Sequence, residues 1–547
     1  MTKRKASDGT PGLVAAAAGC DRLSSLPEDL IGRILSLLPT PQAVLASQLS
    51  RRWRRVWAHV GALNLSVRDC AVRRRGGRAR PRLCALATEA LLRFPTPGIP
   101  SISLEIDHRI YTVDEWYGQA MERAVVSVRV TSLGALTGLE LPPCTRAEAL
   151  SVTSPRTVLT LTGGTGSSPS FGRLAELSLS LVQLGGPPLG DFLSSCCPRL
   201  RALRLCSVRG AAVRRLALRT DALEVLYVSN VDDMTSLDVS AANLRCLTVR
   251  SCFRSPSGGG GGGRGEVAVS APRIEAVRWY RSYPKQLGFC SDMLPNARWL
   301  GGPLKLPALG RRDQLDAPYT MQLLRACSVA HHLDLELVMP DEMTLLSRRL
   351  GPENKGAGED LIRYVPQLPN VSVLSLKLRW GFGGGIAPSL ASILSRTPSL
   401  TRLRMELNPY CFAVYEGEEP TTTTTTRGGQ RWASGVRTDD GLRLDGLREV
   451  SVDGLKGADQ EECRILELLL RGTPRSLQRM SLTFHDDAAA PIVDEIATEV
   501  PARFPMATGR WERCSPSVLT WTKLEDDNSQ PRRAKKFRAS GPGETTT

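Results

Sequence analysis

The stretch "LPEDLIGRILSLLPTPQAVLASQLSRRWRRVW", from Leu26 to Trp57, decides how the N-terminal part of this 547-residue chain folds. Pro27 stands where the first turn of a helix accepts proline, and Pro39 ends the helical pattern that follows it. Thr40 opens a second helix, and Ser50 is placed to cap a third one. The stretch therefore predicts three short helices.

The three predicted helices carry more apolar surface than they can bury among themselves. The apolar residues at helical spacing are Leu30, Ile31, Ile34, Leu35, Leu38, Val44, Leu45, Leu49, Trp53 and Trp57. Large apolar and aromatic side chains beside arginines are typical of the centre of a protein–protein interface. The stretch therefore predicts a helical module whose apolar surplus is covered by another protein.

The same stretch resembles an F-box, in the form found at the front of plant F-box proteins. The matching residues are Leu26-Pro27, Ile34-Leu35-Ser36, Leu38-Pro39-Thr40, Ala43-Val44, Leu49 to Arg54 and Val56-Trp57. The resemblance implies an F-box over residues 21–62 that binds the Skp-type adaptor of a cullin–RING ubiquitin ligase. It implies that this contact includes Leu26, Pro27, Ile34, Leu35, Leu38 and Trp53. We expect the other residues of the apolar faces to join them.

A second pattern, L-x-x-L-x-L with substitutions, recurs along the middle and the end of the chain. Its nine copies begin at Leu174, Leu200, Leu223, Leu244, Ile274, Val371, Leu400, Leu447 and Leu477. The first intervals are 26, 23, 21 and 30 residues, close to the period of leucine-rich repeats. Residues two apart on a strand share a face, so each copy predicts a strand with one buried face. Such units cannot cover their apolar sides alone, so they must stack.

We therefore predict an α/β chain, with an N-terminal three-helix F-box followed by a curved leucine-rich-repeat solenoid. Residues 63–99 hold a first strand and an arginine-rich loop, and residues 100–440 hold degenerate repeats. Surface loops rich in glycine or threonine interrupt these repeats at residues 257–265, 383–385 and 421–426. An ordinary leucine-rich α/β domain is the alternative.

Residues 441–490 predict one more repeat-like unit, with the order strand, loop, helix and strand. Apolar runs begin at Leu447 and Leu477, and the helical run Leu466 to Leu470 lies between them, preceded by Glu461-Glu462. This region is similar to the FBD region that ends many plant F-box/leucine-rich-repeat proteins. The resemblance implies a terminal unit that closes the array.

The net charge of +16 is concentrated in three short segments rather than spread over the body of the chain. Residues 1–20 and 515–547 are basic and are expected to be disordered. Their clusters are candidate nuclear-import signals: Lys3, Arg4, Lys5, Arg532, Arg533, Lys535 and Lys536. The expected location is therefore the nucleus, the cytoplasm or both. Nucleic acid is not the expected partner, although binding through the arginines of residues 68–82 remains an alternative.

The sequence offers no catalytic or metal-binding pattern. Its fourteen cysteines include no C-x-x-C pair, which argues against zinc and predicts free buried thiols. His331-His332 precede an alternating strand, so the two rings would point to opposite faces and could not act as paired ligands. No apolar run approaches the length of a membrane span. We expect a non-enzyme without cofactor, metal or membrane.

The resemblance to F-box/leucine-rich-repeat proteins implies the substrate-recognition subunit of an SCF-type cullin–RING E3 ubiquitin ligase. The F-box would bind the Skp-type adaptor, and through it a cullin, while the repeats would bind a target protein. Such a subunit acts by holding the target near the transferred group. The alternative is an F-box/leucine-rich-repeat scaffold or binding protein with no role in ubiquitination. Two kinds of target stay open: a protein alone, or a protein together with a small molecule.

Overall fold

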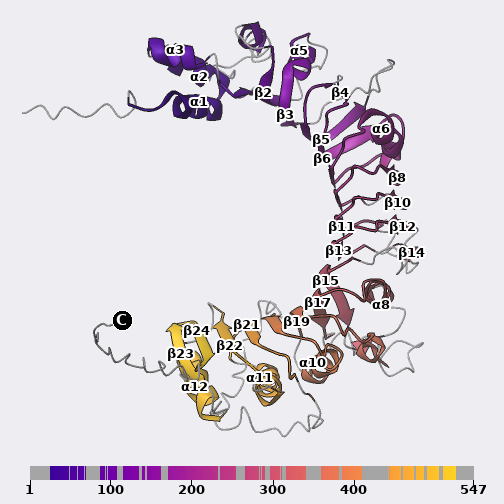
Figure 1. Cartoon of the computed structure of the whole chain (residues 1–547), viewed down its shortest axis with the longest axis vertical. Helices are drawn as coiled ribbons and strands as arrows, with labels where there is room; N and C mark the ends of the chain where they lie inside the picture. Colours follow the sequence, from indigo (N-terminus) through magenta and orange to yellow (C-terminus); the bar gives the residue numbers. More distant parts are fainter. Residues whose placement is uncertain are drawn as a thin grey trace, which may run out of the picture. The chain divides into compact units, whose positions relative to one another are not determined.

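The computed structural model describes the chain between residues 25 and 524. Its longer gaps are residues 69–84, 107–114, 162–170, 254–264, 290–295, 311–315, 340–358, 409–441 and 504–508. The chain divides into two compact units, Met1–Met234 and Thr235–Thr547. Both combine helices with mainly parallel strands, as expected for an α/β chain (Figure 1).

The first unit begins with the three predicted helices, α1 (Glu28–Leu37), α2 (Thr40–Ser47) and α3 (Arg51–Trp57). Their shared core consists of Ile31, Leu35, Ala43, Val56 and Val60. The hydroxyl of Ser50 accepts a hydrogen bond from the backbone N–H of Trp53 at 3.2 Å, so the predicted cap of the third helix is confirmed.

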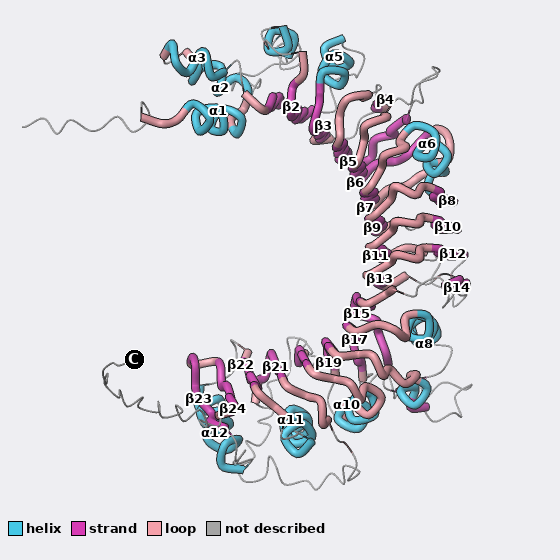
Figure 2. The backbone as a smooth tube through the Cα atoms, in the orientation of Figure 1, coloured by secondary structure: helices cyan, strands magenta, loops and turns pink. Residues whose placement is uncertain are grey.

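The remainder of the first unit is a parallel sheet. Its strands pair in chain order: β1 (Ala62–Ser66), β2 (Ile99–Ile106), β3 (Ala124–Ser132), β5 (Ala149–Leu161), β6 (Glu176–Gly185), β7 (Ala202–Cys206) and β9 (Val225–Ser229). The short strand β4 (Leu139–Leu141) pairs with the second half of β5. The connections form α5 (Glu115–Arg123), α6 (Leu189–Cys196), α7 (Ala211–Arg214) and strand β8 (Arg215–Arg219). Helices α5 and α6 lie on one face of this sheet, so its other face is left open (Figure 2).

The second unit repeats this plan. Its main parallel ladder is β11 (Cys246–Arg250), β13 (Ala276–Tyr280), β15 (Trp299–Pro307), β17 (His332–Val338), β19 (Val373–Arg379), β20 (Arg402–Leu407), β21 (Glu449–Leu455) and β22 (Arg479–Phe484). A second parallel strip is β10 (Ser236–Ser240), β12 (Glu266–Ser270) and β14 (Gln286–Phe289). The connections hold α8 (Asp316–Ala326), the antiparallel pair β16 (Leu309–Gly310) and β18 (Glu359–Asp360), η3 (Leu361–Tyr364), α10 (Ala387–Leu394) and α11 (Gln460–Gly472).

The apolar residues of all nine predicted repeat copies are buried, which confirms a strand with one buried face at each copy. The first residue of a copy closes a tight turn before its strand. For example, the N–H of Leu200 donates to the carbonyl of Cys197 at 3.2 Å, and that of Val371 to Leu368 at 3.3 Å. The connection before the copy at Leu200 holds helix α6, which begins at Leu189.

Neighbouring strands are joined by one carbonyl per repeat that accepts two backbone N–H groups from the next repeat. The carbonyl of Ala175 accepts from Arg201 at 2.8 Å and from Ala202 at 2.9 Å. The carbonyl of Arg201 then accepts from Glu224 and Val225 at 2.8 and 2.9 Å. In the second unit the corresponding acceptors are Arg245, Glu275, Arg298, His331, Ser372, Thr401 and Arg448. This contact fixes the register between repeats.

Further copies of the pattern were not identified from the sequence. Two of them begin with alanine, whereas Ile99-Ile102-Leu104 fits the spacing with isoleucine in two leucine positions. Ile99, Ala147 and Ala330 each begin a turn-and-strand unit whose next two core residues are also buried. Alanine at the first position gives no apolar signal that distinguishes it from an ordinary surface residue.

The predicted order of strand, loop, helix and strand over residues 441–490 is present as β21, α11 and β22. Glu461 is buried, and its carboxylate accepts from the N–H of Ala387 at 2.8 Å, at the start of α10. Glu462 is buried too and accepts from the N–H of Gly457 at 2.7 Å. The acidic pair therefore fastens this unit to its neighbour and to its own loop.

The chain does not end its folded part with this unit. Helix α12 (Ala490–Arg503) and the antiparallel strands β23 (Gly509–Ser515) and β24 (Val518–Lys523) follow it. Strand β24 pairs with β22 and buries Leu519 and Trp521. The prediction of a disordered tail from residue 515 is therefore wrong for residues up to 523. The short alternating apolar run of β24 is the signal that was missed.

Several predicted features fall outside the described residues. These are the two basic ends, almost all of the arginine-rich loop, and almost all of the three glycine- or threonine-rich inserts.

Replacing Leu203 with alanine tests the buried face of the repeats, because Leu203 lies on β7 with no exposed surface. We expect Leu203→Ala to lower the free energy of unfolding of the first unit by about 2–5 kcal/mol, since a cavity is left in a packed core. The measurement is urea denaturation. The matched control is Arg204→Ala on the exposed face of the same strand, which should change stability by less than about 0.5 kcal/mol. Equal effects of the two variants would contradict the assignment of faces.

Candidate functional site

The structure sorts the twelve predicted adaptor-binding residues by their exposure. Leu30, Ile34 and Leu45 are large apolar side chains that are 39%, 37% and 64% exposed on the three-helix module. Pro27 is exposed as well. Five others are partly buried and pack against or beside the helical core: Leu26, Leu38, Val44, Trp53 and Trp57.

Two of the predicted contact residues lie inside the module. Ile31 and Leu35 are 0% and 1% exposed and belong to the core shared by the three helices. In this structure they support the apolar surface and do not form it. Helical spacing alone could not show that Ile31 and Leu35 are buried whereas Leu30 and Ile34 are exposed. All four belong to one apolar stripe, and the short three-helix module buries only one edge of that stripe. Leu49 lies outside the described residues.

Asn64 of β1 fastens the helices to the first strand of the sheet. Its side-chain amide donates to the carbonyls of Ser36 and Leu38 at 2.8 and 3.1 Å, at the end of α1. Its backbone N–H donates to the hydroxyl of Thr40 at 3.0 Å, at the start of α2. These carbonyls are the groups that a helix end leaves without internal partners. One asparagine thus holds the helical module on the repeat strands.

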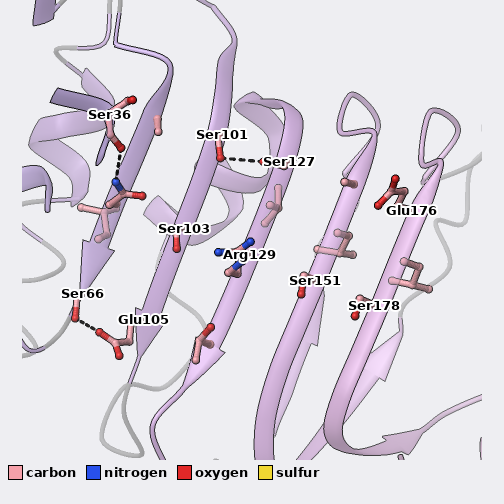
Figure 3. A pocket seen from close by; sticks show the side chains of 18 of the residues that line it. Ser36, Ser66, Ser101, Ser103, Glu105, Ser127, Arg129, Ser151, Glu176 and Ser178 are labelled. Atoms are coloured by element: carbon pink, nitrogen blue, oxygen red, sulfur yellow. Dashed lines mark hydrogen bonds between the residues drawn. The ribbon is translucent and has the colours of Figure 1, made fainter. Parts of the chain in front are cut away.

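A groove of about 840 Å³ runs along the open face of the first unit, from the connection between α1 and α2 to strand β7 (Figure 3). Its floor is set by the strand register, which aligns one residue from each of six strands in a row. The residues of this central row are Asn64, Ser103, Arg129, Ser151, Ser178 and Arg204. Small hydroxyl side chains between two arginines make this floor polar and leave room above the sheet.

The groove presents charged groups of both signs. Glu105 accepts a hydrogen bond from the hydroxyl of Ser66 and lies 3.3 Å from the guanidinium of Arg68. Arg129, Arg204 and Glu176 are exposed and make no side-chain hydrogen bond or ion pair with another described residue. The groove therefore suits a polar chain, but its charges do not favour an acidic or a basic one.

The described side chains show no arrangement suited to covalent chemistry. Within the described parts of the chain, no three His, Cys, Asp or Glu side chains gather as a metal site requires. The described cysteines are free, and six of the nine are buried. Burial raises the pKa of Cys144 to about 11 and, with help from neighbouring Cys196, that of Cys197 to about 12. Thiols with such pKa values stay protonated and are poor nucleophiles.

The histidine pair of the sequence is split between two environments. The ring of His331 meets the carbonyl of Asn370 at 3.0 Å, whereas His332 meets the carboxylate of Asp334 at 2.9 Å. The expectation that the two rings do not act together agrees with this placement. The sequence did not reveal that His332 belongs to a cluster with residues from other strands, because strand pairing brings them together over long separations. The acidic pairs Asp341-Glu342 and Asp486-Asp487 lie outside the described residues.

No helix in the described part of the chain is both long and apolar enough to span a lipid bilayer.

Comparison with known proteins agrees with this geometry at the three N-terminal helices. An F-box domain model matches residues 23–62, which cover helices α1 to α3. A putative F-box/LRR-repeat protein of Arabidopsis thaliana is 29% identical over 43% of this chain and 53% of its own length. An F-box/FBD/LRR-repeat protein of the same plant is 30% identical over 41% of this chain and 50% of its own length.

The chain contains an F-box domain and is similar to plant F-box/LRR-repeat and F-box/FBD/LRR-repeat proteins. An F-box protein of the same plant is 52% identical to the chain over 52 residues, which are 10% of this chain and 13% of its own length. The chain spans about half the length of the first two of these curated relatives. The mixed α/β structure, with its helices at the F-box, fits such relatives.

Replacing Asn64 with alanine tests the attachment of the F-box to the sheet. Two helix-end carbonyls lose their side-chain donor, while the backbone N–H bond to Thr40 stays, so we expect local stability of the F-box to fall by about 1–3 kcal/mol. The measurement is the rate of tryptic cleavage at the arginines of α3, which should rise at least about fivefold. The control Ser66→Ala on the same strand should leave this rate unchanged. An unchanged rate in Asn64→Ala would show that the F-box is held by other contacts.

Proposed function

We propose that this F-box/LRR protein is the substrate-recognition subunit of an SCF-type cullin–RING E3 ubiquitin ligase. The observation that carries the proposal is the group of exposed apolar side chains, Leu30, Ile34 and Leu45, on a module that matches the F-box domain. Burying one such side chain in an interface contributes about 1.5–3 kcal/mol. An F-box typically offers this surface to a Skp-type adaptor, and the adaptor in turn to a cullin.

The repeats supply the other half of the proposed function. Each unit leaves one face of its strands uncovered by helices, and alternate residues of each strand line that face. The rows of polar and charged side chains on it suit recognition of a target protein. The chain would then act without making a bond itself, by holding the target's lysines near the ubiquitin-carrying enzyme.

A curved leucine-rich-repeat solenoid is part of this proposal. It is supported by parallel strands in each unit that follow one after another with the same turn and the same shared carbonyl. The LRR-repeat relatives support it as well. A location in the nucleus, the cytoplasm or both, where such ligases would meet their targets, is proposed from the basic clusters at the two ends.

Adaptor binding should depend on the exposed apolar residues. We expect Ile34→Asp combined with Leu45→Asp to weaken binding of a Skp-type adaptor at least about thirtyfold, because each buries a charge in an apolar interface. Isothermal titration with the purified adaptor measures this effect. The control is Leu92→Asp, which changes another leucine of the first unit that is 77% exposed but lies outside the F-box. Leu35→Asp would be a poor test, because Leu35 is in the core and its replacement would unfold the module. Undiminished binding by the folded double variant would contradict the proposal.

The alternative function is an F-box/LRR scaffold that has no role in ubiquitination. The two functions differ in what the adaptor complex binds next. A ligase subunit bound to its adaptor should retain a cullin on a size-exclusion column, whereas a scaffold bound to the same adaptor should not. A stable adaptor complex that fails to retain any cullin would favour the scaffold.

A further inference from the structure

Five side chains from four neighbouring strands meet on the exposed face of the second unit. We name them the Trp299 cluster: Arg278 of β13, Trp299 of β15, His332 and Asp334 of β17, and Ser375 of β19. The strands that carry them follow one another in the sheet (Figure 1). The guanidinium of Arg278 lies 4.2 Å from the centre of the Trp299 ring, and the ring of His332 lies 5.1 Å from the same indole. All five side chains are half-buried.

Asp334 holds the cluster in one arrangement. One carboxylate oxygen meets Nε2 of His332 at 2.9 Å, and the other accepts from the indole N–H of Trp299 at 3.2 Å. Burial acts to raise the pKa of Asp334, but the hydrogen bond and charge of His332 and the hydrogen bonds from Trp299 and Ser375 outweigh it and hold that pKa below its usual value. Asp334 therefore remains a carboxylate whose oxygens already accept from His332, Trp299 and Ser375. The indole is positioned before any partner arrives.

A break in the strand register makes room for this arrangement. Pairing between β15 and β17 shifts between Leu300 and Leu304, and Gly302 in this interval has a φ of +100°. A Cβ atom on Gly301 would lie 2.7 Å from the carboxylate of Asp334 and 2.8 Å from the indole nitrogen of Trp299. Glycine at this position therefore permits the hydrogen bond between them. Such breaks re-aim side chains next to binding sites.

The charges around the cluster are unbalanced. The acidic residues on this face of strands β11 to β20 all have partners: Asp334 within the cluster, Glu336 with Arg379 at 3.1 Å, and Glu406 with Lys377 at 2.6 Å. By contrast, the arginines Arg250, Arg278 and Arg404 of the same face form no ion pair with a described acidic residue. Among the described residues, the unpaired charges of this face are therefore all positive, whereas those of the groove in the first unit are of both signs.

We propose that the Trp299 cluster is a docking site for an acidic segment of the target protein. An apolar side chain of that segment packs on the exposed part of Trp299, and its carboxylates meet the guanidinium groups of Arg278 and Arg404. A guanidinium that stacks on an aromatic ring still directs its N–H groups outward, where a carboxylate can accept two of them. Tryptophan and arginine are also the residues that most often dominate binding energy at protein interfaces.

Strand geometry sets the length of the segment. Arg278 on β13 and Arg404 on β20 are separated by four strand spacings, which is about 19 Å. An extended chain covers that span with about six residues. The docking site adds the chemistry of the target to the proposed function. It rests on that function in one respect, namely that the bound protein is a target of the ligase.

The test uses the full chain and fluorescein-labelled peptides of about twelve residues, long enough to cover the span. One peptide alternates glutamate and leucine, and a matched peptide has glutamine in place of every glutamate. Fluorescence polarisation should show binding of the glutamate peptide that weakens as salt rises, and at least about tenfold weaker binding of the glutamine peptide. Arg278→Gln with Arg404→Gln should weaken the glutamate peptide at least about tenfold, as the loss of two charged contacts predicts.

Two further variants distinguish binding at the Trp299 cluster from general attraction between a basic protein and an acidic peptide. Gly301→Ala should also weaken binding, because the added Cβ displaces the Asp334–Trp299 hydrogen bond without changing charge. Arg510→Gln removes an exposed arginine from β23, outside the proposed site, and should leave binding unchanged.

Several results would overturn the proposal. They are no binding of the glutamate peptide, equal binding of the two peptides, unchanged binding by the double arginine variant, or tighter binding of a single-stranded oligonucleotide than of the peptide. Adaptor titration with the same variants reads out the proposed function separately. If the wild-type chain does not bind the adaptor, the proposed function is wrong, but the docking-site proposal is unaffected. The peptide measurements test only the docking site.

Discussion

From β5 to β22, the alignment of side chains on the exposed faces depends on one backbone contact, the carbonyl that accepts two N–H groups from the next repeat. Because the acceptor is the residue just before each strand, every strand starts at the same level as its neighbour. Side chains two apart then fall into rows across the sheet, with leucine, isoleucine and valine toward the core. The serine and arginine row of the first unit and the Trp299 cluster of the second unit are both consequences of this register.

The F-box depends on a different balance. Three helices of ten, eight and seven residues can close only a small core, and Ile31, Leu35 and Val56 occupy it. The other apolar residues of the helices therefore stay on the surface of the module, because its core has no room for them. Asn64 ties this small module to a much larger sheet by satisfying helix-end carbonyls that would otherwise need water. The same residue begins the row that forms the floor of the groove, so attachment and groove share one strand.

Local patterns predicted much of this fold. Proline and serine positions predicted the three helices, and the L-x-x-L-x-L spacing predicted nine buried strand faces, because both signals involve residues close in sequence. The copies that begin with Ala147 and Ala330 were missed, since alanine fills the first position without an apolar signal. Strand β24 was missed because only two of its residues, Leu519 and Trp521, carry the pattern beside a basic tail.

The candidate sites were less predictable than the fold. Helical spacing placed Leu35 on the same stripe as Ile34, and only the packing of α3 against α1 shows which of them faces outward. The Trp299 cluster joins residues that are far apart in sequence, and its formation depends on a register break at Gly301 and Gly302. Neither the break nor the strand order can be read from spacing in one sequence, so the sequence excluded His332 as a paired ligand of His331 but did not reveal its contacts with Trp299 and Asp334.

The central claim is that the F-box and the repeats bind different partners and that the F-box alone contacts the adaptor. Hydrogen–deuterium exchange of the full chain, with and without a saturating Skp-type adaptor, tests it directly. The account predicts that amide exchange slows in residues 25–57 and stays unchanged in the strands from β2 to β22. Unchanged exchange in residues 25–57, or protection centred on the repeat strands, would contradict it.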